Sequence, residues 1–416
     1  MNLTPILLII VIVVVGAGFY ATLNYQQNLP ADQRQISKNP STDSRHNGTQ
    51  ENRYYTGSSG CEGKGTINFT SPSRRLEDTE MILPLGMMSN EHIVPTDHQY
   101  YYIHNWTRNP QPNDLRDVLA PADGFITSVQ LMPSWTFYSK QGLEDYRMEI
   151  YHTCSFYTVY IHLLKLSPKI KETIGVLAES KTVPVKIPVK AGEVIGAATS
   201  LDFSAHNNDM TLKGFVIPQH YDGEPWKIHT VDPFDYFNEP LRVELLTKVM
   251  RTVQPYGGKI DYDIDGRLVG NWFAENSGGY SGKTSGEYNY WSNHLALTYD
   301  AIYPSHIIFS IGTFTTKGEG KQFGVKGNGP DPATIDKGSG LIKYELVTFD
   351  YKTRTGKNWD RISYASNLKS VNNDDQIRGA ALLQLVEDRK LKVEVFPGKT
   401  ATEVSGFTNN AVTYER

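Results

Sequence analysis

The sequence is short of cysteine, of positive charge and of long amphipathic helices. It has two cysteines in 416 residues, and its net charge is −4 without a basic cluster, which gives nucleic-acid binding no support. Its 35 glycines, 25 tyrosines and 22 prolines favour a protein rich in β-strands and turns. A chain of this length has room for two or three domains.

Only one long hydrophobic run stands out, and it lies at the start. Residues 3–23 contain no charged side chain, and about 20 apolar residues suffice to cross a bilayer as a helix. A cleaved signal peptide is the alternative, but Met1-Asn2 supplies no basic residue, and Gly16-Ala17-Gly18 matches a cleavage site only loosely. We therefore predict an uncleaved anchor over residues 1–23 that places residues 3–23 in the membrane.

Residues 24–60 are polar and nearly free of aliphatic side chains, so they predict a flexible tether. Two features place the rest of the chain outside the cytoplasm. Glycosylation sequons begin at Asn47, Asn68 and Asn105. The only two cysteines of the sequence, Cys61 and Cys154, suggest one disulfide in an exported protein; two buried free thiols are the alternative. The predicted location is a single-pass membrane protein with the bulk of the chain extracytoplasmic.

Three short sequence motifs lie in the middle of the chain. Val118-Leu-Ala-Pro-Ala-Asp-Gly-Phe-Ile126 contains Asp-Gly, a pair typical of hairpin turns. Tyr160-Ile-His-Leu163 lies within residues 149–166, whose Tyr, Val, Ile and Thr predict one or two buried strands. Val189-Lys-Ala-Gly-Glu-Val-Ile-Gly196 predicts a turn and then a short strand, and residues 175–188 before it are expected to form a loop.

In this order the three sequence motifs resemble those of the M23 (lysostaphin-like) peptidase domain, also described as a duplicated hybrid motif. The resemblance covers about residues 82–237. It implies a small β-sandwich, which we expect over residues 61–238. Fold alone does not establish that the chemistry of the family is present.

The resemblance also implies where a zinc site would lie. In the family, zinc is held by the His and Asp of an H-x-x-x-D motif and by the second His of H-x-H. The first His of H-x-H and the His of Y-x-H-L assist catalysis. Three protein ligands leave an open position where zinc activates water. Carried over to this chain, the Y-x-H-L histidine is His162.

The other positions depart from the family pattern. Asp202 stands in place of the second histidine of H-x-H, and Ser200 stands in place of the first. A carboxylate can still bind zinc, but serine cannot act as a general base at neutral pH. His92 and Asp97 are one residue too far apart for H-x-x-x-D, and His98 follows at once. The candidate metal ligands are therefore His92, Asp97, His98 and Asp202.

Two interpretations of this cleft stay open. In the first, the polar groups satisfy one another, no cofactor is bound, and the protein binds a cell-envelope polymer or surface protein or supports the envelope. In the second, the protein is an active zinc metalloendopeptidase with an altered ligand set, in which His162 assists catalysis. We expect the first, because the family chemistry needs the missing histidine pair.

Beyond this region, residues 239–254 have helical spacing at Leu241, Leu245 and Val249 and predict a connecting helix. Residues 255–416 show short strands and glycine turns at even spacing. The clearest strands are expected at 295–299, 307–311, 341–349, 380–386, 391–396 and 411–414. The predicted fold class is therefore mainly β: a transmembrane helix, an M23-like β-sandwich, and a second antiparallel β sandwich or barrel.

Asp261-Tyr-Asp-Ile-Asp-Gly266 copies the start of a calcium-binding loop, with possible ligands Asp261, Asp263 and Asp265. Position twelve of such a loop should be Glu but is Trp272. We therefore expect a hairpin turn at Asp265-Gly266 and no calcium. Aromatic residues such as Trp272 and Tyr280 are expected in the core, although stacking on sugar rings is the alternative.

Overall fold

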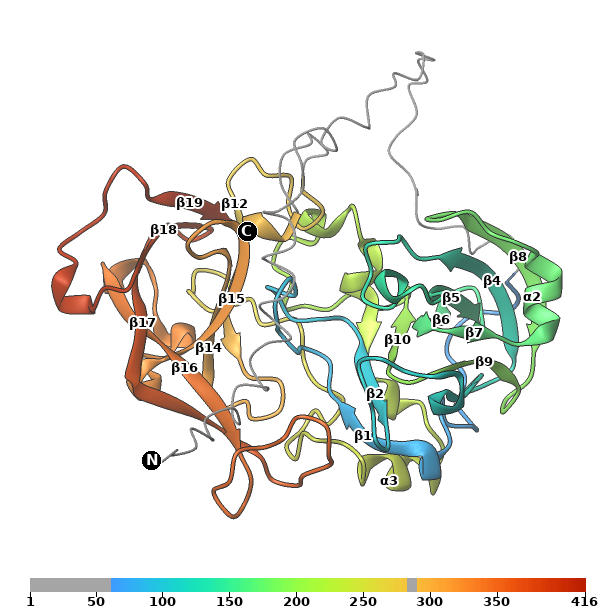
Figure 1. The fold of residues 1–416 in the computed structure, drawn as a ribbon. Coiled ribbons are helices and arrows are strands. Elements are labelled where there is room, and N and C mark those ends of the chain that lie inside the picture. The colour runs from blue at the N-terminus through green and yellow to red at the C-terminus, as the bar shows by residue number, and fades with distance from the viewer. Residues whose placement is uncertain (1–60, 283–289) are drawn as a thin grey trace, which may run out of the picture. The chain divides into compact units, whose positions relative to one another are not determined.

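Strands dominate the structure, as the sequence predicts, and helices are few and short (Figure 1). The computed structural model describes residues 61–282 and 290–416, which belong to one compact unit. The predicted anchor (1–23) and tether (24–60) lie outside the described residues and stay predictions, as do the domain boundaries near 238 and 255. Within the described ranges, every helix is too short or too polar to cross a bilayer.

The first part of the chain builds an eight-stranded antiparallel sheet. Its strand order is β1-β2-β10-β6-β5-β4-β8, and β11 pairs with β10. The strands are β1 (Thr79–Leu83), β2 (Gln99–Ile103), β4 (Gly124–Leu131), β5 (Tyr146–Tyr151), β6 (Phe156–Leu163), β8 (Thr182–Val189), β10 (Leu201–Asn207) and β11 (Thr230–Val231). A smaller sheet has the order β3 (Arg116–Leu119), β9 (Val194–Ala198), β7 (Lys165–Leu166).

One hydrophobic cluster joins the two sheets. It contains Ile126, Tyr160 and Phe203 from the larger sheet and Val118 and Ile195 from the smaller one, and all five are fully buried. Burial of this much apolar surface is the main favourable contribution to folding. The two sheets therefore share a core.

The Asp123-Gly124 turn does not close a hairpin, so that prediction is wrong. Strand β3 pairs with β9, whereas β4 pairs with β5 and β8, and the turn leads from one sheet into the other. The Asp123 carboxylate accepts hydrogen bonds from the backbone N–H of Ala191 at 2.9 Å and from the Lys190 ammonium at 2.7 Å. It thereby fastens this turn to the predicted turn before β9, which is present with Gly192 at a φ of 79°.

Residues 182–189 form strand β8, although a loop was expected over 175–188. Pro184 and Pro188 suggested a loop, because proline cannot donate to a strand ladder. Strand β8 lies at the end of the sheet and pairs only with β4, and an edge strand tolerates proline. The predicted helix at 239–254 is also shorter than expected: α3 spans only Leu241–Leu246. A further α-helix, α2, spans Pro168–Ile174.

Residues 255–416 contain a closed antiparallel barrel, which confirms the predicted alternative to a sandwich. The barrel strands are β12 (Gly270–Ala274), β13 (His294–Tyr299), β14 (Ile307–Thr313), β15 (Lys317–Val325), β16 (Ile342–Lys352), β17 (Lys369–Glu387), β18 (Lys390–Pro397) and β19 (Val412–Glu415). Trp272 and Tyr280 are buried, as expected. The pairing of β12 with β19 closes the barrel.

Cys61 and Cys154 form a disulfide in the structure, with their Cα atoms 5.0 Å apart. Cys154 lies in the turn between β5 and β6, while Cys61 precedes the first strand by 18 positions. The bond therefore ties the start of the described chain to the middle of the larger sheet.

Candidate functional site

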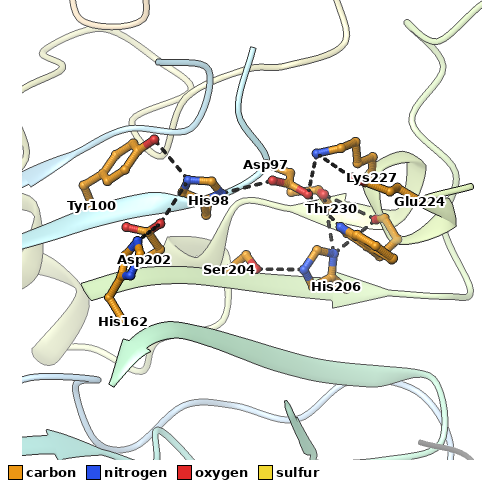
Figure 2. Close-up of polar contacts among 11 residues, drawn as sticks. Asp97, His98, Tyr100, His162, Asp202, Ser204, His206, Glu224, Lys227 and Thr230 are labelled. Atoms are coloured by element: carbon orange, nitrogen blue, oxygen red, sulfur yellow. Dashed lines mark hydrogen bonds and ion pairs between the residues drawn. The ribbon is translucent and has the colours of Figure 1, made fainter. Parts of the chain in front are cut away.

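Polar side chains gather where β2, β10 and β6 lie side by side (Figure 2). Asp202 of β10 stands opposite Tyr100 of β2 and Ile161 of β6. Strict alternation would turn His162 to the other face of the sheet. His162 has a φ of 70°, which breaks the alternation, and its Nε2 lies 3.5 Å from Oδ2 of Asp202.

His98 precedes β2 and is buried beside the same carboxylate. Its Nε2 lies 3.4 Å from Oδ2 of Asp202 and 3.0 Å from the hydroxyl of Tyr100. Its Nδ1 lies 3.1 Å from Oδ1 of Asp97. His98 therefore links the Asp202 side of the site to a second charged group around Asp97, as Figure 2 shows.

The second group is a buried ion pair between Asp97 and Lys227, each 7% exposed. The Lys227 ammonium lies 3.0 Å from Oδ2 of Asp97, and the indole N–H of Trp226 donates to the same oxygen at 2.9 Å. Burial alone would raise the pKa of Asp97, but Lys227 and the hydrogen bond with His98 hold it well below its usual value. Asp97 is thus a carboxylate whose oxygens already have partners.

His162 lies between two carboxylates. Its Nδ1 is 3.0 Å from Oδ2 of Asp145, on the side away from Asp202. Burial opposes the charged imidazole, but Asp202 and Asp145 together raise the pKa of His162 to about 9. Near neutral pH the side chain is therefore a cation held in two ion pairs.

Ser200 is held by a tyrosine from the loop between β4 and β5. Its hydroxyl lies 2.7 Å from that of Tyr138, which is also 3.0 Å from the hydroxyl of Thr199. Beneath this turn the fully buried Arg74 donates to the carbonyls of Thr199 and Ala198 at 2.5 and 3.1 Å. These contacts fix the backbone at the position where the family has its first H-x-H histidine.

At the other end of β10, His206 belongs to the framework. The Ser204 hydroxyl lies 2.8 Å from its Nε2, and its Nδ1 lies 3.1 Å from the carbonyl oxygen of Trp226. Burial lowers the pKa of His206 to about 4, so the ring is neutral at neutral pH.

Of the predicted site residues, the structure brings His98, Asp202 and His162 together, and joins Asp97 to them through His98. His92 lies apart from Asp202: its ring packs edge-on against the ring of His98 at 5.6 Å. Burial and the neighbouring cations lower the pKa of His92 to about 3.

Sequence reasoning missed Asp145, Tyr138 and Lys227, which come from loops and short turns without a motif. It also missed a spacing: His98 and Tyr102 are four positions apart, as in H-x-x-x-D, with tyrosine in place of aspartate. Burial and the Asp202 charge raise the pKa of Tyr102, so this hydroxyl stays protonated.

The family zinc set does not fit these residues as they stand. In residues 61–282 and 290–416, no group of three or more His, Cys, Asp or Glu side chains is arranged to hold a metal ion. Asp97 is engaged by Lys227 and Trp226, and His162 would have to release its proton before it could bind a metal.

The calcium-like segment has separate protein partners for each carboxylate. Asp261 binds Lys259 and the N–H of Gly214, and Asp263 accepts the N–H of Asn271. Asp265 forms a two-point contact with Arg389. Asp265-Gly266 is a turn, but the residues before it are not a strand, so the expected hairpin is wrong.

The charge on His162 can be measured directly. In an NMR titration, we expect the imidazole of His162 to have a pKa of about 9 and that of His152, whose pKa is lowered by burial, a pKa of about 4.

The free energy of unfolding should depend on the same proton. The stabilisation that protonated His162 provides is complete below pH 6.5, its unperturbed pKa, and is lost as the pH rises through 9. Asp145→Asn should lower the pKa of His162, whereas Asp388→Asn on the surface should not. A His162 titration near 6.5 would contradict the two ion pairs.

No protein-family model matches the sequence, and no curated protein matches it. One similar solved chain comes from the "Structure of the SpoIIQ-SpoIIIAH pore forming complex", with 14% identity over 43% of this chain and 96% of that chain and a TM-score of 0.26. Another is the NMR solution structure of lysostaphin, with 10% identity over 84% of this chain and 92% of that chain and a TM-score of 0.22. Similarities this weak decide neither the fold nor the function.

Proposed function

We propose that the protein is a non-hydrolytic, membrane-anchored component of the cell envelope that binds an envelope polymer or a surface protein. The observation that carries this proposal is the ion-paired state of His162. A histidine with a pKa of about 9, fixed between Asp145 and Asp202, cannot take a proton from water near neutral pH.

The neighbouring positions support the same conclusion. Ser200 occupies the place of the first histidine of H-x-H, the other residue that assists catalysis in the family, and its hydroxyl is hydrogen-bonded to that of Tyr138. A serine without an adjacent base does not accept protons at neutral pH. The site therefore has neither of the two proton acceptors that peptide hydrolysis in this family would use.

The proposed location depends on the sequence and on one covalent bond. Residues 3–23 have the length and apolar character of a membrane span. The Cys61–Cys154 disulfide supports an extracytoplasmic position for the rest of the chain, because disulfides persist mainly in oxidising compartments.

An altered zinc site is the second candidate, and one observation favours it. Nε2 of His98 and Nε2 of His162 lie 3.4 and 3.5 Å from the same oxygen of Asp202. Ligand atoms of a tetrahedral zinc ion are roughly 3.3 Å from one another. The Nδ1 atoms of the two histidines face Asp97 and Asp145, and metal-bound histidines usually have such carboxylate partners.

One set of measurements separates the two candidates. The full-length protein, purified in detergent without chelator, is assayed for zinc, for cleavage of peptide-cross-linked glycan, and for cosedimentation with that insoluble polymer. We expect cosedimentation without cleavage, and no stoichiometric zinc in either the parent protein or Asp202→Ala. About one zinc per chain that is lost in Asp202→Ala, together with cleavage, would overturn the proposal.

A further inference from the structure

A pocket beside the barrel contains none of the residues that surround His162. It is a pocket of about 480 Å³, which is within the usual size range of small-molecule sites. Its lining comes from the chain after β10, from the segment before β12, and from the end of β13. The residues that matter for the argument are Lys213, Lys259, Asp261, Tyr262, Ile264 and Tyr299.

Two tyrosine rings form the apolar part of the pocket. The rings of Tyr262 and Tyr299 are 5.7 Å apart at an interplanar angle of 66°. Tyr299 is fixed by its hydroxyl, which donates to Asp331 at 2.6 Å. Ile264 adds an aliphatic side chain that is 48% exposed. Tyr262 is only 8% exposed and backs the pocket, whereas Tyr299 is partly exposed, so its ring offers a face on which the C–H side of a sugar or another flat ring can stack.

The lysines supply the free hydrogen-bond donors of the pocket. Lys213 is exposed. The Lys259 ammonium donates to Oδ1 of Asp261 at 2.5 Å and lies 5.5 Å from the centre of the Tyr262 ring. An ammonium group has three donors, so one ion pair leaves capacity for a ligand.

The carboxylates of the pocket accept hydrogen bonds from backbone N–H groups of the protein. Oδ2 of Asp261 accepts the backbone N–H of Gly214 at 2.9 Å, and Asp263 accepts the N–H groups of Asn271 and Val216 at 2.8 and 3.3 Å. Asp261 is also paired with Lys259, and Asp263 with the buried Arg416, and the two carboxylate side chains are only 13% and 3% exposed. The side chain of Lys259 is 39% exposed and Lys213 is exposed, so the ammonium groups are the accessible charges at the opening. A ligand with a flat apolar face and a negative charge therefore matches the pocket.

We propose that this pocket binds a pyranose that carries a carboxylate. In the cell envelope, the ligand would be an acidic sugar unit of the polymer that the protein binds, so this inference rests on the proposed function. The ring stacks on Tyr299, and the carboxylate pairs with Lys213 and Lys259. Oδ1 of Asp261 accepts a sugar hydroxyl, which favours a sugar over an aromatic acid.

The probe is glucuronic acid, titrated calorimetrically into full-length protein in detergent, with glucose and benzoate as comparisons. We expect glucuronic acid to bind and glucose and benzoate to bind much more weakly. Lys213→Gln should weaken glucuronic acid binding about tenfold, because one charge-assisted contact is lost. Lys64→Gln, on an exposed lysine outside the pocket, should leave binding unchanged.

The aromatic wall has its own matched pair of variants. Tyr299→Phe keeps the ring and should retain binding, whereas Tyr299→Leu removes the ring and should abolish it, with folding of both checked by thermal melting. The inference is overturned if glucuronic acid does not bind at millimolar concentration, if Lys213→Gln binds as well as the parent protein, or if benzoate binds equally well.

The same variants keep this inference distinct from the proposed function. If the polymer cosediments equally with the parent protein and Lys213→Gln, the pocket assignment fails while the proposed function stands. If glucuronic acid binds but no polymer cosediments, the proposed function fails while the pocket remains.

Discussion

Replacement of Asp97 by alanine is expected to lower the free energy of unfolding by about 3–5 kcal/mol, because it removes the nearest carboxylate from a buried cation. Lys227 is 7% exposed and lies 3.0 Å from the Asp97 carboxylate. Its remaining carboxylate neighbour, Glu224, is 3.4 Å away, and burial raises the pKa of Glu224, which weakens it as a substitute. Thermal unfolding should show a fall in Tm of roughly 10 °C.

The control for Asp97 is an ion pair on the surface. Asp388 and Lys337 are 67% and 61% exposed and 3.6 Å apart, so Asp388→Ala should cost about 0–1 kcal/mol. The double variant Asp97→Ala/Lys227→Met should recover part of the stability, because it removes the buried positive charge as well. Equal losses in Asp97→Ala and Asp388→Ala would contradict the buried ion pair.

Replacement of Trp272 by alanine should cost about 3–5 kcal/mol, the usual range for a large aromatic residue removed from a core. Trp272 is fully buried in β12, and its indole N–H donates to the carbonyl of Leu268 at 2.9 Å. The Arg416 guanidinium lies 4.1 Å from the ring centre. The variant therefore leaves a cavity in the strand that closes the barrel, and it leaves the carbonyl of Leu268, just before that strand, without this donor.

Chemical denaturation followed by circular dichroism measures this loss. Trp135→Ala is the matched control, because Trp135 is 64% exposed, and its removal should change the free energy of unfolding by no more than about 0.5 kcal/mol. If the two variants unfold at the same denaturant concentration, Trp272 does not have the structural role assigned to it.

Local patterns predicted most strands but not all of their partners. Short apolar runs between turn residues located β13, β14 and β18; nearly every residue of β13 and β14 is buried, whereas buried and partly exposed residues mostly alternate in β18. Strand β17 begins at Lys369, well before the expected start at Ala380. The sequence did not indicate this first part of the strand because its residues are mostly polar; backbone pairing with β16 holds them in the sheet. An Asp-Gly pair signals a turn, but it does not reveal whether the two flanking strands belong to one sheet.

The candidate site was predictable only where a motif identified a residue. His162 and Asp202 were predicted because three sequence motifs, in their order, resemble those of the M23 family. Asp145 did not, because its proximity to His162 depends on the pairing of Tyr146 with Leu163 and on the positive φ of His162, which no sequence pattern marks. The ion pair of Asp97 with Lys227 joins residues 130 positions apart in the sequence, and although an altered H-x-x-x-D pattern pointed to Asp97, no motif contains Lys227.

The Cys61–Cys154 bond determines the path of a mechanical load through the protein. A pull on the chain before Cys61 passes across the disulfide to Cys154 and enters the larger sheet at the turn between β5 and β6. Residues 62–153, which include β1 to β5, form a covalently closed loop, so the pull is not transmitted along their backbone. If the chain is tethered as proposed, force therefore bypasses Asp97 and His98, and shear falls first on β6 and its neighbours, β5 and β10.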